Sequence, residues 1–465
     1  MNSPAFLWRS QTSFVLMAVG ATLSLKDFLT FPVLAGQNGG GAFLLLYVFF
    51  LITLGLPLLM SEIMLGRISR QNPVSAIENL AKEHGASIHW KSIGGLALIA
   101  GFLILSSYSV IAGWSISYLF KMGFGVYVGA TADGANNLFD LFRTDTERMM
   151  LWHTMFVLLF VAISAQGIRL GVEKIFFIIV PAMVVLLVIG LVYAVYSQGI
   201  EESLAFLFNV DFSKIDSKVP ILALQRAFYT LALGVGVMMI YGSYLPDNIS
   251  IARAATLVIS IDLIFSICTG LAINALVFTA ELTPVQDNEL AFRVLPVVFG
   301  QFEYGHIFGA LFYLLLTIAA LTTSIALLEG VISWVMSKYQ YTRLRAVIYT
   351  GIGVWFLGLG SVLSYSIWRD SGFTLALYFK DDAYRIINQA NFQDGLIFIS
   401  SHLIQPLVAL FICLFAAWVI PRKVSFKGLN LKNRKMYEAW NFAVRYVTPM
   451  LIFIVLISTL GLLRL

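Results

Sequence analysis

The sequence predicts an all-α integral membrane protein with about eleven transmembrane helices, and its composition supplies two of the reasons. Of 465 residues, 59% are hydrophobic and 12% are charged, against about 45–50% and about 25% in soluble domains. The third reason is that apolar residues gather in long blocks, each near the ~20 residues that a helix needs to cross a bilayer. These blocks use up the chain, which excludes a nuclear, DNA-binding or cytosolic protein despite the net charge of +5.

Glycine, proline and charged residues separate the apolar blocks, and they bound the expected helices. The expected spans are residues 11–36, 41–66, 92–124, 150–166, 168–197, 219–245, 253–280, 305–337, 345–366, 395–420 and 438–463. The first block is too long for a cleavable signal peptide and carries Lys26 and Asp27. Cys268 and Cys413 each lie within a span, so we expect neither a disulfide framework nor a metal cluster.

Basic residues concentrate in two loops, after the second and the tenth spans. They are Arg67, Arg70, Lys82, Lys91, Arg422, Lys423, Lys427, Lys432, Arg434 and Lys435. Loops rich in lysine and arginine face the cytoplasm, so we expect a cytoplasmic N-terminus and, after an odd number of spans, an external C-terminus. We expect a multi-pass protein of the plasma (inner) membrane, with linkers 125–149, 281–304 and 367–394 as partly ordered external caps.

Two spans contain helix-breaking residues at corresponding places. The first holds Gly20 and Ser24 before Phe31-Pro32, and the sixth holds Gly234 and Gly236. Interrupted helices at matching positions of two five-helix halves indicate a transporter's midplane binding site. The alternative is that these small residues only let neighbouring helices pack closely.

Three charges lie within apolar spans: Lys26 and Asp27 in the first and Asp262 in the seventh. Each costs about 2.5–3.5 kcal/mol at the bilayer centre, so a function is expected, either as a cluster that touches an ion or substrate or as an ion pair that joins two helices. Residues adjacent in sequence do not face each other on a regular helix. A pair between Lys26 and Asp262 is therefore at least as reasonable as one between Lys26 and Asp27.

Further polar residues lie inside apolar spans. Glu62 and Glu329 are expected to hydrogen-bond the backbone of the broken helices. In the eighth span, Thr322 and Thr323 either bond back to carbonyls of their own helix or join carbonyls freed at a helix break to form a Na⁺ site. The second alternative requires that span eight face the break in span one.

Several stretches together carry a more specific pattern. They are Trp8, Phe31-Pro32, the run NGGGAF at 38–43, Pro57-Leu58 with Glu62 and Gly66-Arg67, Tyr108-Ser109-Val110 with Gly113-Trp114, Gly167-Ile168 with 171–174, 241–244, 290–292 with Leu295-Pro296, and 319–324. Through nearly its whole length the sequence resembles the neurotransmitter:sodium symporter family of secondary transporters. The resemblance implies a LeuT-type 5+5 inverted repeat, with residues 1–197 as helices 1–5, residues 198–420 as helices 6–10, and residues 421–465 as a basic cytoplasmic loop and helix 11.

The resemblance also implies site residues. The family's second sodium site maps onto carbonyls of Gly20, Leu23 and Ala319 and hydroxyls of Thr322 and Thr323. The substrate pocket maps onto Ala21, Thr22, Ser24, Leu25, Lys26, Ile104, Tyr108, Tyr229, Thr230, Ala232, Val235, Thr323 and Leu327. Tyr108 is expected to contact a substrate carboxylate and Tyr229 to be the outer lid, while Glu62, Arg226 and Trp8 are expected to support or gate the site.

The sequence departs from the family at the first sodium site. Asp27 and Asp262 stand where the family has two asparagines, and Lys26 replaces a glycine. The Lys26 ammonium is expected to stand in for the first Na⁺, as a compact cation with three donors can. One lysine against two aspartates leaves about −1, which a protonated aspartate, a substrate ammonium or a retained cation can neutralise. Arg226, in place of a family glutamine, is expected as a cation of the external vestibule.

These expectations combine into a symporter that couples one Na⁺ to a small or medium neutral amino acid by alternating access. Its expected partners are the amino acid and membrane lipid, with no nucleic acid and no organic cofactor. We do not expect an enzyme, because the five histidines are scattered along the chain. One alternative is an H⁺-coupled or Na⁺/H⁺-coupled amino acid or amine transporter in which Lys26, Asp27 or Asp262 titrates. Another is a non-transporting amino acid sensor.

Overall fold

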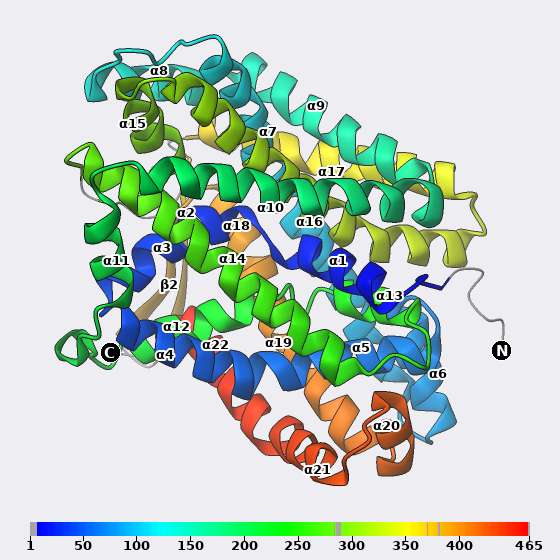
Figure 1. The fold of residues 1–465 in the computed structure, drawn as a ribbon. Coiled ribbons are helices and arrows are strands. Elements are labelled where there is room, and N and C mark those ends of the chain that lie inside the picture. Colours follow the sequence, from blue (N-terminus) through cyan, green and yellow to red (C-terminus); the bar gives the residue numbers. More distant parts are fainter. Residues whose placement is uncertain (1–6, 283, 285–289, 370, 380–381, 464–465) are drawn as a thin grey trace.

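A computed structural model describes residues 7–282, 284, 290–369, 371–379 and 382–463. The side chains of Lys26, Leu29 and Leu170, and most of those at 373–389, lie outside the described part. The described chain is mainly helical, and Figure 1 shows its long helices running roughly alongside one another. The expected class, an all-α membrane protein, is confirmed.

The helices have the following bounds. They are α1 (Gln11–Thr22), α2 (Leu25–Leu29), α3 (Phe31–Gln37), α4 (Gly41–Phe50), α5 (Leu56–Ser69), α6 (Pro73–Glu83), α7 (Lys91–Gly123), α8 (Ala132–Thr144), α9 (Thr146–Ala165), α10 (Glu173–Val195), α11 (Ile200–Phe208), α12 (Val219–Tyr229), α13 (Val237–Ser243), α14 (Ile251–Thr279), α15 (Leu295–Gln301), α16 (Gly305–Tyr339), α17 (Arg343–Tyr365), α18 (Phe392–Ile397), α19 (Gln405–Leu414), α20 (Arg422–Leu429), α21 (Arg434–Phe442) and α22 (Thr448–Thr459). Segments of π-helix lie at Leu51–Gly55, Ile168–Val172, Leu290–Val294, Phe398–Ile404, Phe415–Val419 and Ala443–Val447, and 3-10 turns lie at Ile88–Trp90 and Phe212–Lys214.

Nine helical segments of the described chain are long and apolar enough to cross a membrane. They are Gly41–Ser69, Ile88–Gly123, Thr146–Ala165, Glu173–Val195, Ile251–Thr279, Gly305–Tyr339, Arg343–Tyr365, Phe392–Val419 and Arg434–Thr459. These match the second to fifth and the seventh to eleventh expected spans. The two remaining expected spans, the first and the sixth, are broken helices, and neither is continuous enough to be counted with the nine.

Both predicted breaks are present. In the first span α1 ends at Thr22, Leu23 has an extended backbone, and α2 and α3 follow. In the sixth span α12 ends at Tyr229 and α13 begins at Val237, and the connection contains Gly234 and Gly236 with φ of +75° and +77°. Hydrophobic pattern and glycine placement were therefore sufficient to predict these breaks.

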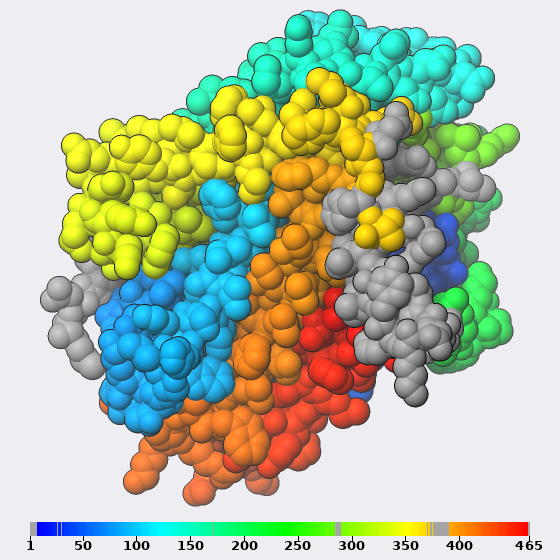
Figure 2. Space-filling view, turned by 180° about the vertical axis from the view of Figure 1, so that it is seen from behind, coloured from blue at the N-terminus to red at the C-terminus, as the bar shows by residue number. Residues whose placement is uncertain are grey.

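The helices surround the first span. α1 packs against α10, α14, α13 and α16, so its break is enclosed by other helices. Figure 2 shows the opposite face of the molecule, where α7, the α18–α19 segment and α22 lie side by side.

The expected caps contain ordered structure at the end of the molecule away from the start of α1 (Figure 1). α8 lies in the first of these linkers and α15 in the second. In the third, β1 (Phe373–Phe379) pairs antiparallel with β2 (Asp382–Ala390). This hairpin was not predicted, because its linker has no regular alternation of polar and apolar residues.

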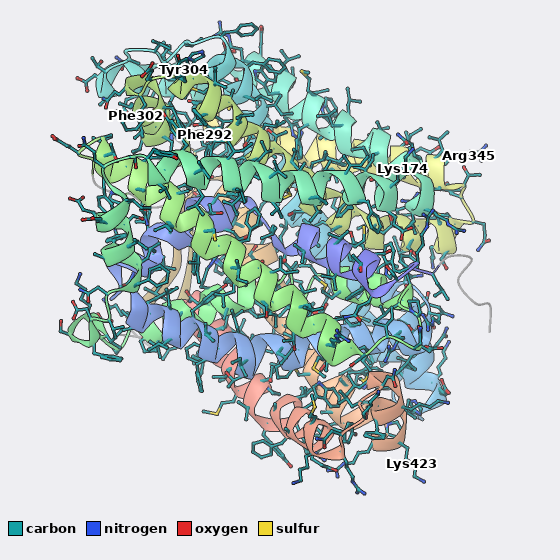
Figure 3. The ribbon with its side chains drawn as sticks, in the orientation of Figure 1. Lys174, Phe292, Phe302, Tyr304, Arg345 and Lys423 are labelled. Carbon is teal, nitrogen blue, oxygen red and sulfur yellow. The ribbon has the colours of Figure 1, made fainter. Side chains whose placement is uncertain are left out.

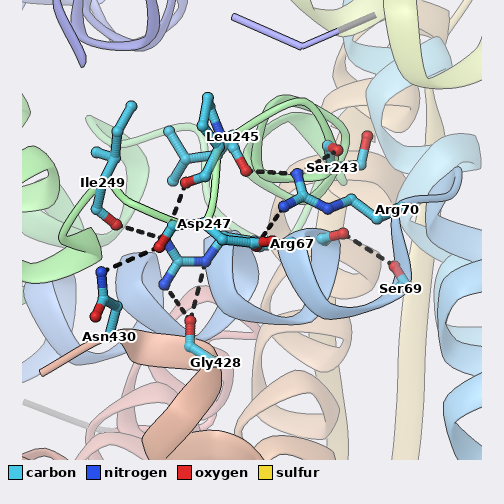
Figure 4. Close-up of polar contacts among 11 residues, drawn as sticks. Arg67, Ser69, Arg70, Ser243, Leu245, Asp247, Ile249, Gly428 and Asn430 are labelled. Atoms are coloured by element: carbon cyan, nitrogen blue, oxygen red, sulfur yellow. Dashed lines mark hydrogen bonds and ion pairs between the residues drawn. The ribbon is translucent and has the colours of Figure 1, made fainter. Parts of the chain in front are cut away.

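Two arginines of the first basic loop, Arg67 and Arg70, make specific bonds, drawn in Figure 4. Arg67 donates from Nε to the Gly428 carbonyl at 3.0 Å. Arg70 donates to the Ser243 carbonyl at 3.2 Å and forms an ion pair with Asp247. These bonds fasten the end of α5 to the connection that follows α13 and to α20.

Candidate functional site

The break in the first span is shaped by one carboxylate. The Ser24 amide donates to Asp27 Oδ2 at 2.6 Å, and the Ser24 hydroxyl lies 3.0 Å from the same oxygen. In a continuing helix that amide would bond the carbonyl of Gly20, four residues earlier. Asp27 thus takes the amide that would prolong α1, and the Gly20 carbonyl at the helix end stays available to another partner.

The two threonines of α16 face this break. Thr323 Oγ1 lies 3.1 Å from the Leu23 carbonyl oxygen and 3.1 Å from that of Ala319. Thr322 Oγ1 lies 2.9 Å from the Ala319 carbonyl oxygen. All four residues are buried. The condition set by the sequence, that span eight face the break in span one, is met.

Gly20 brings α1 close to α16 at this point. A Cβ atom there would lie 3.2 Å from Thr322 Cβ and 2.7 Å from a ring carbon of Phe176. A larger residue would push α1 away from both neighbours. The Leu23 and Ala319 carbonyls and the Thr323 hydroxyl therefore meet, with Thr322 packed against Gly20. Unwound carbonyls with nearby hydroxyls are the kind of ligands that coordinate Na⁺ in transporters with broken helices.

The two carboxylates within the spans, Asp27 and Asp262, also come together, and Arg226 is an additional member of this group. Arg226 of α12 forms an ion pair with Asp27 Oδ1, and the two side chains are 5% and 1% exposed. Thr230 Oγ1 lies 3.0 Å from Asp27 Oδ1 and 3.0 Å from Asp262 Oδ2. We call Asp27, Arg226, Thr230 and Asp262 the charge cluster. It joins the first, sixth and seventh spans.

The external-vestibule position expected for Arg226 was wrong, whereas its expected role in supporting or gating the site stays a prediction. Arg226 was assigned to the external vestibule, yet its side chain is buried on Asp27, with its guanidinium carbon 5.4 Å from the centre of the Phe31 ring. A buried carboxylate requires a counter-charge, and the long arginine side chain reaches it from one turn before Thr230. The Lys26 side chain lies outside the described part, so its expected pairing is not tested.

Residues predicted for the substrate pocket surround the two breaks. Ala21, Thr22, Leu25, Thr230, Val235, Thr323 and Leu327 are buried, and Ser24, Ile104, Tyr108, Tyr229 and Ala232 are partly buried. The Leu25 amide donates to the Tyr108 hydroxyl at 3.2 Å, which links α2 to α7. A Cβ atom at Gly101 of α7 would lie 3.3 Å from the Val235 carbonyl oxygen and 3.7 Å from Leu327.

The second break is held by Glu62 and by a residue that was not anticipated. The Gly234 amide donates to Glu62 Oε1 at 2.7 Å, which is the backbone contact expected of this acid. Gln405 of α19 donates to the Leu233 carbonyl at 2.8 Å. A glutamine inside an apolar span is itself a signal of such a role. Tyr229, the expected lid, donates to the Ser401 carbonyl at 3.1 Å.

The end of the site nearest the start of α1 is held by Trp8. Its backbone and indole N–H groups donate to the Tyr244 and Tyr241 carbonyls, each at 2.9 Å. Glu329 takes a partner other than the expected helix break. Arg343, at the start of α17, donates to its two oxygens at 3.0 and 2.7 Å. The expectation for Glu329 was therefore wrong, because this acid lies nearly two turns beyond Thr322 and beside another helix.

Comparison with known proteins identifies the family. The model of the sodium:neurotransmitter symporter family matches residues 6–125 and 137–463. The chain belongs to this family. The resemblance inferred from the sequence motifs is confirmed, and the family is one of transporters rather than enzymes.

Similar proteins agree with this membership of the symporter family. The sodium-dependent transporter YhdH of Bacillus subtilis (strain 168) is 31% identical over 463 residues, 98% of each chain. A sodium-dependent transporter of Haemophilus influenzae (strain ATCC 51907 / DSM 11121 / KW20 / Rd) is 30% identical over 99% of each chain. The crystal structure of MhsT in complex with L-phenylalanine matches 98% of this symporter-family chain with a TM-score of 0.84 at 33% identity, and 99% of MhsT is covered.

Proposed function

We propose that the protein is a symporter that uses Na⁺ to carry a small or medium neutral amino acid across the plasma (inner) membrane. The observation that carries the proposal is the contact of the Thr323 hydroxyl of α16 with the Leu23 carbonyl at the end of α1, beside Thr322, which packs against Gly20. Family membership supplies the coupling to Na⁺. Bound there, the ion would be held by the Gly20, Leu23 and Ala319 carbonyls together with the two hydroxyls.

The proposed substrate class rests on the residues around the breaks. Ile104, Val235 and Leu327 offer apolar surface with few polar partners, and Tyr108 offers a hydroxyl beside the α2 backbone. MhsT, which has the same fold, is known with L-phenylalanine bound. A neutral amino acid fits these features, since the α2 backbone and Tyr108 can bind its carboxylate. The apolar side chains of the protein can enclose the side chain of the amino acid.

The proposed mechanism is alternating access between two inverted repeats, residues 1–197 and 198–420. Na⁺ would tie α1 to α16, and substrate would tie the first span to the sixth at their breaks. The N-terminus would be cytoplasmic. In Figure 3 Lys174, Arg345 and Lys423 lie toward the end where α1 begins, and Phe292, Phe302 and Tyr304 lie toward the other, as the positive-inside rule requires.

We further propose that a fixed cation replaces the first sodium ion, so that transport uses one Na⁺ ion. Lys26 is the cation expected from the sequence, and its backbone lies in α2 next to Asp27. The Lys26 ammonium would supply the positive charge that Na⁺ would otherwise bring to Asp27 and Asp262.

The Na⁺ site is tested by uptake into proteoliposomes at fixed pH with and without a Na⁺ gradient. The double variant Thr322→Ala and Thr323→Ala should lose Na⁺-driven uptake, because two of the five proposed ligands are removed. The matched control is Thr317→Ala with Thr350→Ala, two buried threonines whose hydroxyls bond carbonyls of their own helices. Equal loss in the control, or Na⁺-driven uptake in the double variant, would contradict the proposal.

A second candidate is H⁺-coupled transport, and one observation favours it. Asp262 is buried, and its Oδ1 has no hydrogen-bond partner in the described part of the chain. A carboxyl group in that environment can hold a proton. Uptake that persists without Na⁺, follows a pH gradient and is lost in Asp262→Asn would establish this candidate in place of the first.

A further inference from the structure

The charge cluster raises the question of whether a first sodium ion fits in this chain. The family resemblance places that ion at Asp27 and Asp262. Both Asp27 oxygens are already engaged: Oδ1 accepts from Arg226 and lies 3.0 Å from the Thr230 hydroxyl, and Oδ2 accepts from the Ser24 amide at 2.6 Å. A sodium ion on Oδ1 would sit beside a guanidinium of the same charge. Asp262 Oδ1 has no partner among the described residues, but an ion bound there would lack Asp27 as its second carboxylate. The residues present therefore do not fit an ion shared by Asp27 and Asp262.

Burial strengthens both the attraction between Arg226 and Asp27 and the repulsion between Arg226 and a sodium ion. Arg226 and Asp27 are 5% and 1% exposed, so water does not screen either charge. Unlike charges attract and like charges repel far more strongly there than at a surface. The Phe31 ring, with its centre 5.4 Å from the guanidinium carbon, holds the arginine on its other side by a cation–π contact. Arg226 is therefore fixed where it bonds Asp27.

The ion pair between Arg226 and Asp27 also changes the net charge of the ionisable groups within these spans. Lys26 alone against Asp27 and Asp262 leaves about −1. Arg226, paired with Asp27, supplies a second positive charge, so that the sequence offers two cations for the two carboxylates. The cluster then needs neither a retained metal ion nor a substrate ammonium for neutrality.

We infer that Arg226 is a built-in counter-cation that closes the first sodium position, and that the transporter consequently couples one Na⁺ ion to each substrate. This inference rests on the proposed function and deepens it. Arg226 acts as a positioning residue, because its guanidinium holds Asp27, which in turn bonds Ser24 at the break. The ion pair also ties α12 to α2 across the two broken spans.

The wild-type protein provides the first test. Proteoliposomes are loaded with a defined Na⁺ and membrane potential gradient, and the reversal of amino acid flux gives the number of Na⁺ ions moved per substrate. We expect one. Two Na⁺ ions per substrate would overturn the inference and the proposed one-ion stoichiometry but leave Na⁺-coupled amino acid symport standing, whereas transport without any Na⁺ dependence would refute the symport itself.

Substitutions provide the second test. Arg226→Gln leaves a buried negative charge, so Na⁺ activation of uptake should steepen, with a Hill coefficient that rises from about 1 to about 2. Arg226→Gln combined with Asp27→Asn restores neutrality and should return the Hill coefficient to about 1. Arg226→Lys keeps the positive charge, and its Hill coefficient should stay at about 1. The control is Arg293→Gln, which removes a cap ion pair to Asp140 outside the site. An unchanged coefficient in folded Arg226→Gln overturns the inference. If that variant does not fold, the wild-type stoichiometry decides.

Discussion

The sequence identified the buried polar side chains at the two breaks more readily than it identified their bonding partners. The sequence contained Thr322, Thr323 and Glu62 as polar groups in apolar helices, and the contacts of Glu62 with the broken backbone are those expected. Arg226 was recognised as unusual, but its partner was not, because a long side chain can reach several places and only packing selects one. Local pattern identifies a residue that needs a partner, while tertiary structure determines which partner it has.

Glu62 gives a prediction at this scale. Glu62→Leu leaves the Gly234 amide without its acceptor, and an unsatisfied buried donor costs about 1–3 kcal/mol. Glu62→Gln keeps a carbonyl oxygen at this place. It should lower substrate affinity and the temperature of thermal unfolding in detergent less than Glu62→Leu does. Ser61→Ala, which removes a hydroxyl bonded within its own helix, is the control. Equal effects of Leu and Gln would contradict the assigned role.

Helices were predicted more completely than the segments between them. The long spans follow from hydropathy, and the break in the sixth follows from Gly234 and Gly236. The β1–β2 hairpin and the partner of Glu329 were missed. Arg343, the partner, begins the helix after the one that carries Glu329, so that the bond depends on how α17 turns back along α16.

The pair of α16 and α17 supplies a prediction for these elements. Arg343→Met leaves Glu329, 3% exposed, as an unpaired buried charge, which costs about 3–5 kcal/mol. The double variant Arg343→Met and Glu329→Leu should recover most of that stability, since neither charge remains. Unfolding in detergent measures both. Arg345→Met, an exposed arginine on the same helix, should change little. A double variant no more stable than the single one would argue against a pairwise role.

Two loops rich in basic residues, after the second and the tenth expected spans, predict the orientation of the whole molecule, and this topology can be tested. In a background of Cys268→Ser and Cys413→Ser, Glu303→Cys should react with a membrane-impermeant thiol reagent in intact cells. Lys423→Cys should react only after the membrane is opened, because positive loops stay in the cytoplasm. Both positions are exposed in the structure. The reverse labelling pattern would invert the proposed orientation.

Asp27 belongs to two assemblies at once: it withdraws the Ser24 amide from the Gly20 carbonyl, and it holds Arg226. A movement that strains the arginine bond would also alter the carbonyls that we propose as Na⁺ ligands at the end of α1. Coupling free energies between binding sites are reciprocal. If a bound amino acid holds the Asp27 carboxylate more firmly in place and so raises the affinity for Na⁺, then Na⁺ raises the affinity for the amino acid by the same factor. In the proposed symport, one aspartate would thereby provide a route for cooperative binding of ion and substrate that requires no direct contact between them.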